Sequence, residues 1–394
     1  MFGDDVVIFS DKSCVYPESG DTTLDWTRWF RRAIAASAHQ IQQAERWIRA
    51  NPDKIFLDAK CIRQLPIPMP SSDRIRIHRV CVATGAAHRC LAETARPSLA
   101  LDLSIRGDAM PLTLGRVDEV SGHLHVLDEA SLTSVLNELS TTADFIAYLV
   151  AREELVSRGF FQSARAEVDV LAEYLWHNRS FPAVAVPYSL RAGLWEQLLA
   201  DPTYQAGRRE NAVSAFWDGL IEYVTDHYLE GSLEFGNDVE MSQYEALART
   251  MASENRFYRR ILSKSVLERA DKARERMISS LLPSGQQDVF YVLLIGPGAQ
   301  SGDYGAYRTA RGQELQLRCY AAKVVRPEAR IIVGIALDAR GLDGGSEDFV
   351  FLDTANWTPD DMERAARIRN QQKYFVPGRV IESRMNEDEY PGAH

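Results

Sequence analysis

Short apolar, β-branched runs alternate with amphipathic stretches along this chain, which predicts a mixed α/β protein. The first run, residues 5–9, reads Asp-Val-Val-Ile-Phe and predicts a buried strand. After a polar turn, Thr22 and Asp25 have the spacing of a helix start, and apolar residues from Trp26 to Ile48 then recur at three- and four-residue steps. Asn51-Pro52 ends this long helix. Further strands are predicted at residues 54–58, 74–84, 99–105 and 123–127.

The pattern then changes twice, which predicts three parts. Helical periodicity dominates residues 129–285, with helices expected near 129–140, 142–158, 163–177, 188–200, 210–230 and 240–282. The last part has strands at 289–295, 330–337 and 348–352, a helix at 304–325, and a final helix after Thr358. We therefore expect an α/β unit at 1–128, a helical region at 129–285, and a small, partly parallel α/β unit at 286–394 whose tail after Pro377 is poorly ordered.

Composition narrows the class of protein without selecting a function. The chain has 394 residues, 45% of them hydrophobic and 25% charged, which are ordinary globular values. Its net charge of −10 predicts no general attraction to nucleic acid or membranes, so any polyanion must bind a local basic patch. The five cysteines form no C-x-x-C pair, and no signal peptide or membrane-length apolar run is present. A cytoplasmic protein with reduced thiols, no structural zinc and no membrane partner is the expectation.

The end of the first strand carries the residues most suited to chemistry. Ser10, Asp11 and Lys12 follow Val6-Val7-Ile8-Phe9 directly. A carboxylate at a strand end can hold a divalent cation that activates water, and a nearby lysine can neutralise charge on a phosphate. This pattern predicts Asp11 as a metal ligand and Asp11 and Lys12 as catalytic residues. The alternative is a solvated polar turn after a strand.

The order of strand, Ser10-Asp11-Lys12 and a helix carrying Gln40 in SAHQIQQAERWI resembles the PD-(D/E)xK restriction-endonuclease-fold superfamily, and within it the NERD-like nuclease-related domains. The resemblance covers residues 1–60. It implies a nuclease-like phosphodiesterase using Mg²⁺, either active or degenerate, with Asp11, Lys12 and Gln40 as catalytic residues.

Two departures from the family pattern accompany this resemblance. Ser10 stands where the family has an acidic residue, so Asp11 can replace it only if the strand twists or bulges there. The preceding strand, with its first acidic residue, is missing. We therefore expect either a true start upstream of Met1 or a truncated copy of the fold, and in both cases an incomplete metal site.

A local basic face is predicted on the long helix, opposite its apolar positions. Arg28, Arg32 and Arg46, with Arg31 and Arg49 beside them, would contact nucleic-acid phosphates. The same arginines are also typical of the solvated side of an amphipathic helix.

Other functions stay open alongside the nuclease reading. The chain could be a non-catalytic interaction protein built on an inactive nuclease fold, with binding through its helical middle. It could also be a small-molecule enzyme with a site at Gly296-Pro297-Gly298, which lies between a strand and a helix. His123 and His125 alternate on a predicted strand, so both project to one face and could ligate a metal or lie on an exposed edge.

Overall fold

The computed structural model consists of two compact units, residues 1–205 and 206–394. It describes residues 1–117, 122–230, 241–299, 303–341, 346–377 and 389. Within these residues the strands form three sheets, so the predicted mixed α/β class is confirmed. No helix in the described part is long and apolar enough to cross a membrane.

The first unit is built on two small sheets. Its strands are β1 (Asp5–Ser13), β2 (Arg76–Thr84), β3 (Ala100–Arg106), β4 (Thr113–Arg116), β5 (Leu124–Leu127), β6 (Phe161–Ala164) and β7 (Tyr188–Ser189). Its helices are α1 (Thr22–Phe30), the π-helical turn η1 (Arg31–Ala35), α2 (Ala36–Ala50), α3 (Ala87–Thr94), α4 (Glu129–Glu138), α5 (Thr142–Ser157), α6 (Glu167–Trp176) and α7 (Leu194–Ala200). The helix α8 (Pro202–Glu210) contains the boundary between the two units. The sheet orders are β1-β2-β5, all parallel, and β4-β3-β6-β7.

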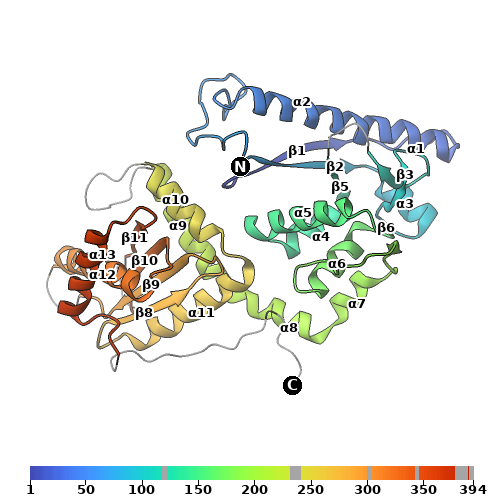
Figure 1. The fold of residues 1–394 in the computed structure, drawn as a ribbon. Coiled ribbons are helices and arrows are strands. Elements are labelled where there is room, and N and C mark those ends of the chain that lie inside the picture. Colours follow the sequence, from blue (N-terminus) through green and yellow to red (C-terminus); the bar gives the residue numbers. More distant parts are fainter. Residues whose placement is uncertain (118–121, 231–240, 300–302, 342–345, 378–388, 390–394) are drawn as a thin grey trace. The chain divides into compact units, whose positions relative to one another are not determined.

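The sheet β1-β2-β5 lies between two helical layers (Figure 1). The helices α1 and α2 cover one face, and α4 and α5 lie on the other. Trp26 and Trp29 of α1 are fully buried, and their indole N–H groups donate to the carbonyls of Asp108 and Cys14. Burial of both rings, with both polar groups satisfied, fixes the long helix at the end of β1.

The second unit is a four-stranded sheet, β11-β10-β9-β8, with helices on both faces. Its strands are β8 (Ile278–Pro283), β9 (Val289–Gly296), β10 (Ile331–Asp338) and β11 (Asp348–Asp353). Its helical segments are η2 (Asn211–Ser214), α9 (Ala215–Glu230), α10 (Met241–Ala252), α11 (Arg256–Lys272), α12 (Tyr304–Val325) and α13 (Pro359–Gln372). The parallel pairing of β9 and β10 confirms the predicted strand–helix–strand connection through α12.

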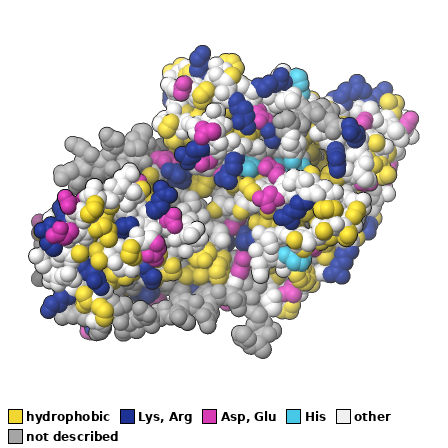
Figure 2. Space-filling model, viewed as in Figure 1, with side chains coloured by type: hydrophobic (Ala, Val, Ile, Leu, Met, Phe, Trp, Pro, Cys, Tyr) yellow, Lys and Arg dark blue, Asp and Glu magenta, His cyan; other side chains and the backbone are white. Residues whose placement is uncertain are grey.

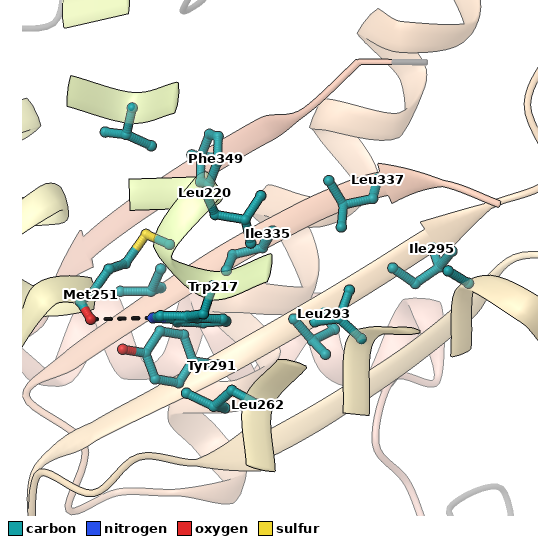
Figure 3. Packing of buried hydrophobic residues seen from close by; sticks show 14 of the residues in the cluster. Trp217, Leu220, Met251, Leu262, Tyr291, Leu293, Ile295, Ile335, Leu337 and Phe349 are labelled. Carbon is teal, nitrogen blue, oxygen red and sulfur yellow. Dashed lines mark hydrogen bonds between the residues drawn. The ribbon is translucent and has the colours of Figure 1, made fainter. Parts of the chain in front are cut away.

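Alternate residues of β9 enter two different hydrophobic cores. Tyr291 and Leu293 pack against α9, α10 and α11, where the indole N–H of Trp217 donates to the Met251 carbonyl (Figure 3). Phe290, Val292 and Leu294 pack against α12 on the other face. Because β9 is buried on both faces, it reads as a continuous apolar run, as parallel strands commonly do.

The three-part division differs from the structure, because the helical middle does not form a unit of its own. The helices α4 to α7 belong to the first unit, and α9 to α11 pack on the sheet of the second. An amphipathic helix needs a surface on which to bury its apolar face, and in both halves of the middle region a sheet supplies it.

Several local predictions also need correction. Residues 54–58 do not form a strand but a loop with a single bridge, Phe56 to Gln64, because the Asp58 carboxylate accepts three backbone N–H groups there. The start of the predicted helix at 163–177 is occupied by β6, and the end of the one at 240–282 by β8. The helix α3 and the strand β4 were not anticipated. The tail after Pro377 lies outside the described residues, apart from Glu389.

The capping box of α13 gives a first testable prediction. The Thr358 hydroxyl accepts the Asp361 amide at 3.3 Å, and the Asp361 carboxylate accepts the Thr358 amide at 2.8 Å. Replacing Thr358 with Ala removes this cap and should cost about 1 kcal/mol of local stability, whereas Ser should restore most of it. Amide hydrogen exchange over Pro359–Gln372 measures the change. Equal protection in the Ala and Ser variants would contradict the assigned cap.

Candidate functional site

The two faces of β1 point toward different helices. From Asp5 to Ser13 the strand pairs with β2 in an unbroken parallel register, so successive side chains alternate in direction. The Phe9 ring stacks on Phe145 of α5, with centroids 6.1 Å apart. The Ser10 hydroxyl instead donates to Gln40 Oε1 of α2 at 3.2 Å. Even-numbered residues of β1 therefore face α2, and odd-numbered ones face α5.

This alternation divides the predicted catalytic set. Lys12 lies on the α2 side with Ser10 and Gln40, at the outer edge of the sheet, since β1 is an edge strand. Asp11 is exposed and lies on the opposite face. The strand contains no bulge that would turn Asp11 toward the other two. Lys12 and Gln40 thus share one side of the strand, as expected, and Asp11 does not join them.

The described residues do not complete a magnesium site around Asp11. Within the part of the chain that the structure describes, no group of three or more His, Cys, Asp or Glu residues is placed to hold a metal ion. Ser10 holds the position at which the resembled family has an acid, and its hydroxyl is engaged with Gln40. The roles of Asp11 as a metal ligand and of Mg²⁺ as a cofactor stay predictions.

The arginines of the long helix are exposed, and most keep their charge available. Arg49 contacts the Glu45 carboxylate at 3.1 Å. Arg32 donates to the carbonyls of Arg28 and Val15, so its guanidinium lies at the loop that follows β1. Arg46 donates to Gln42. Among the described residues, no carboxylate lies within 4.0 Å of the guanidinium groups of Arg28, Arg31, Arg32 or Arg46.

Trp47 is a surface residue of this region that the sequence pattern did not single out. Its side chain is 54% exposed on α2, whereas the tryptophans of α1 are buried. It follows Gln40 by seven residues, close to two helical turns, so both side chains lie on the same side of α2. The feature that could have revealed Trp47 is its position on the helix, where its indole lies away from the buried residues Ile41 and Glu45.

The glycine-rich loop after β9 does not form an open cradle for phosphate. The Tyr307 hydroxyl accepts the Gly298 amide at 3.2 Å and donates to Asp338 at 2.8 Å. A Cβ at Gly296 would lie 2.1 Å from that hydroxyl, so Tyr307 fills the space beside the loop. The alternative enzyme site at Gly296-Pro297-Gly298 therefore gains no support.

No family model matches the chain, and neither a curated protein nor a solved structure shows significant similarity to it. The resemblance to PD-(D/E)xK nucleases consequently stays a prediction. Function has to be inferred from the side chains themselves and from their contacts.

Proposed function

We propose that the first unit is a degenerate nuclease-like unit that binds the backbone of nucleic acid along α2 and the edge of β1 without cutting it. The observation that carries this proposal is the shared placement of Lys12 and Gln40 beside Ser10, with Asp11 on the other face. Binding groups are thus retained on one side of the strand, and the predicted metal ligand is separated from them.

The charges around this edge support contact with phosphates. The Lys12 amine, on β1, has no ion-pair or hydrogen-bond partner among the described residues. Arg28 and Arg32 lie on the long helix that follows β1 in the chain. The chain as a whole carries −10, and Figure 2 shows Lys and Arg side chains interspersed with Asp and Glu over the face in view. Attraction must therefore come from this local group of cations, and it weakens as salt screens it.

Trp47 adds a contact of a different kind. An exposed indole offers a π-face on which an unpaired base can stack, and such stacking is worth roughly 1–3 kcal/mol per base. Because Trp47 lies on the same side of α2 as Gln40, a single strand that follows the helix would reach both. We therefore expect the protein to prefer single-stranded over double-stranded nucleic acid.

Fluorescence anisotropy with a labelled single-stranded oligonucleotide tests the proposal on the full chain. The double variant Arg28→Gln/Arg32→Gln should weaken binding roughly tenfold and reduce the salt slope by about two, one for each lost phosphate contact. Trp47→Ala should weaken binding by a similar factor with an unchanged slope. Arg367→Gln, an exposed arginine of α13 in the second unit, is the matched control and should have no effect.

Two results would contradict the proposal in different ways. Mg²⁺-dependent cleavage that is lost in Asp11→Asn and in Lys12→Ala would show an active nuclease in place of a degenerate one. Absence of binding at low salt, by protein with an intact fold, would remove nucleic acid as the ligand. The interaction-protein alternative would then be the one to pursue.

A further inference from the structure

A cavity of about 580 Å³ lies in the first unit at the β5 edge of the sheet, the edge opposite β1. Apolar side chains such as Leu103, Leu114 and Val156 form part of its lining. The polar lining consists of Arg79, Arg116, Arg152, His123, His125, Ser157, Glu153 and Glu167. A cavity of this size, with apolar side chains and convergent polar groups in its lining, is typical of small-molecule sites.

One wall of the cavity carries a chain of hydrogen-bonded titratable groups. Glu153 Oε1 lies 2.9 Å from His78 Nδ1 and 3.2 Å from His125 Nε2, and His78 Nε2 lies 2.9 Å from Asp5 Oδ1. These contacts join β1, β2, α5 and β5. Both nitrogens of His78 therefore face carboxylates, which only a ring protonated on both nitrogens can satisfy by donation.

The same contacts determine which ring nitrogen of His125 carries the proton. Burial tends to raise the pKa of Glu153, but the hydrogen bonds from His125 and His78 outweigh it and lower that pKa to about 2. Ionised Glu153 only accepts, so His125 donates its Nε2–H. Burial lowers the pKa of His125, and it lowers that of His123 well below the usual range, so both rings are neutral at pH 7. His125 Nδ1 is then an acceptor, and it has no hydrogen-bond partner among the described residues.

Two arginines give the cavity capacity for an anion. Arg152 is 2% exposed; its Nε and Nη2 contact Glu167, while Nη1 has no hydrogen-bond partner in the described part of the chain. A buried N–H without an acceptor costs roughly 1–3 kcal/mol, which an oxyanion that reaches Nη1 from the cavity would recover. Arg116 lines the cavity with an exposed side chain that has no ion pair among the described residues. Arg79, in contrast, has an acceptor at each guanidinium nitrogen, because Nε and Nη2 donate to Glu45 at 2.7 Å and Nη1 donates to the Ile77 carbonyl at 3.4 Å.

We propose that this cavity binds a small organic anion, with an apolar body against the leucine side chains, a carboxylate or phosphate on Arg152 and Arg116, and a donor group on His125 Nδ1. Glu153 acts as a positioning residue, because it holds the imidazole of His125 in the orientation and tautomer that present Nδ1 as an acceptor. The site uses none of the side chains assigned to nucleic-acid binding, so either proposal can fail without the other.

Histidine ring ¹⁵N spectra of the full chain test this assignment, with benzoate and phenyl phosphate as anionic probes and benzamide as the neutral control. The His123→Gln and His125→Gln variants identify the resonances of these two rings. Each anion should shift both resonances, and the shifts should saturate as the anion concentration rises to roughly 10 mM. Tighter binding of phenyl phosphate would indicate a phosphate ester as the ligand class, and tighter binding of benzoate a carboxylate. Benzamide should bind at least tenfold more weakly, as expected for the loss of charge-assisted hydrogen bonds.

Substitutions at the rim complete the test. Arg116 is exposed, so the Arg116→Gln variant should fold. It should bind both anions roughly tenfold more weakly than the native chain. Arg158→Gln is the control, because Arg158 follows α5 but does not line the cavity. The proposal is overturned if neither anion shifts the two histidines, if benzamide binds as tightly as the anions, or if Arg116→Gln leaves both affinities unchanged.

Discussion

Replacing Arg311 with Met is expected to lower the stability of the second unit by about 3–5 kcal/mol, the usual cost of leaving a buried charge unpaired. The Arg311 side chain is fully buried and contacts Asp338 at 2.5 Å and Asp348 at 2.7 Å. It also donates to the Ser346 carbonyl at 2.9 Å. Asp338 ends β10 and Asp348 begins β11, so one guanidinium joins α12 to both strands.

Amide hydrogen exchange measures this effect in the full chain, because it reports the opening of β10 and β11 separately from the first unit. In Arg311→Met, peptides from both strands should lose most of their protection. The matched control is Arg330→Met, an exposed residue next to the start of β10, which should change little. Unchanged protection of β10 and β11 in Arg311→Met would show that the buried ion pairs do not hold the sheet to α12.

Sequence pattern predicted best those elements whose partners lie nearby in the chain. The run from Val289 to Ile295 is apolar throughout, as a strand buried on both faces requires, and the helix from Tyr304 to Val325 begins and ends where its periodicity does. Boundaries between units were missed for a physical reason. Periodicity shows that a helix has an apolar face, but not which sheet covers that face.

The candidate site at β1 was predictable only in part. Two-residue alternation already implied that Asp11 and Ser10 face opposite ways, and only an irregular strand could have reversed this. The register of β1 with β2 is regular, which separates Asp11 from Lys12 and Gln40. Whether a strand bulges depends on its partner strand, and in this chain the partner comes some 70 residues later.

The histidine cluster at the cavity could not be inferred from spacing. His78 and Glu153 are 75 residues apart, and His125 and Glu153 are 28 apart, on elements that meet only in the folded sheet. No short motif links such residues, so only their contacts reveal them. The alternation of His123 and His125 placed both on one face, and the structure brings their rings into edge contact with centroids 4.7 Å apart.

The stability of the first unit should depend on pH through His78. Burial lowers the pKa of this ring, but its hydrogen bonds to Asp5 and Glu153 outweigh burial and raise the pKa to about 9 from 6.5. A raised pKa contributes stability that is complete below pH 6.5 and is lost as pH rises through about 9. At about 1.4 kcal/mol per pKa unit, the loss should amount to about 3–4 kcal/mol.

His123 and His125 act in the opposite direction. Their pKa values are lowered by burial, so the unfolded chain binds protons on these rings more readily, and stability falls as pH drops below 6.5. The first unit should therefore be most stable near pH 6.5, with losses on both sides. Among the charged groups near His78, Asp5 and Glu153 contact it directly, while Arg76 and His125 lie behind these two carboxylates.

Hydrogen exchange of β1 and β2 in the native chain, compared with His78→Gln across about pH 6 to 8.5, isolates this contribution, because groups that the variant retains cancel in the difference. The buried thiols of Cys81 and Cys90 have pKa values raised to about 12, chiefly by burial, and they lower stability only above pH 9. The difference between the two proteins should be largest near pH 6.5 and should shrink steadily toward alkaline pH. A difference that stays constant over this range would mean that His78 is not held as an imidazolium between Asp5 and Glu153, and the tautomer assigned to His125 would lose its support with it.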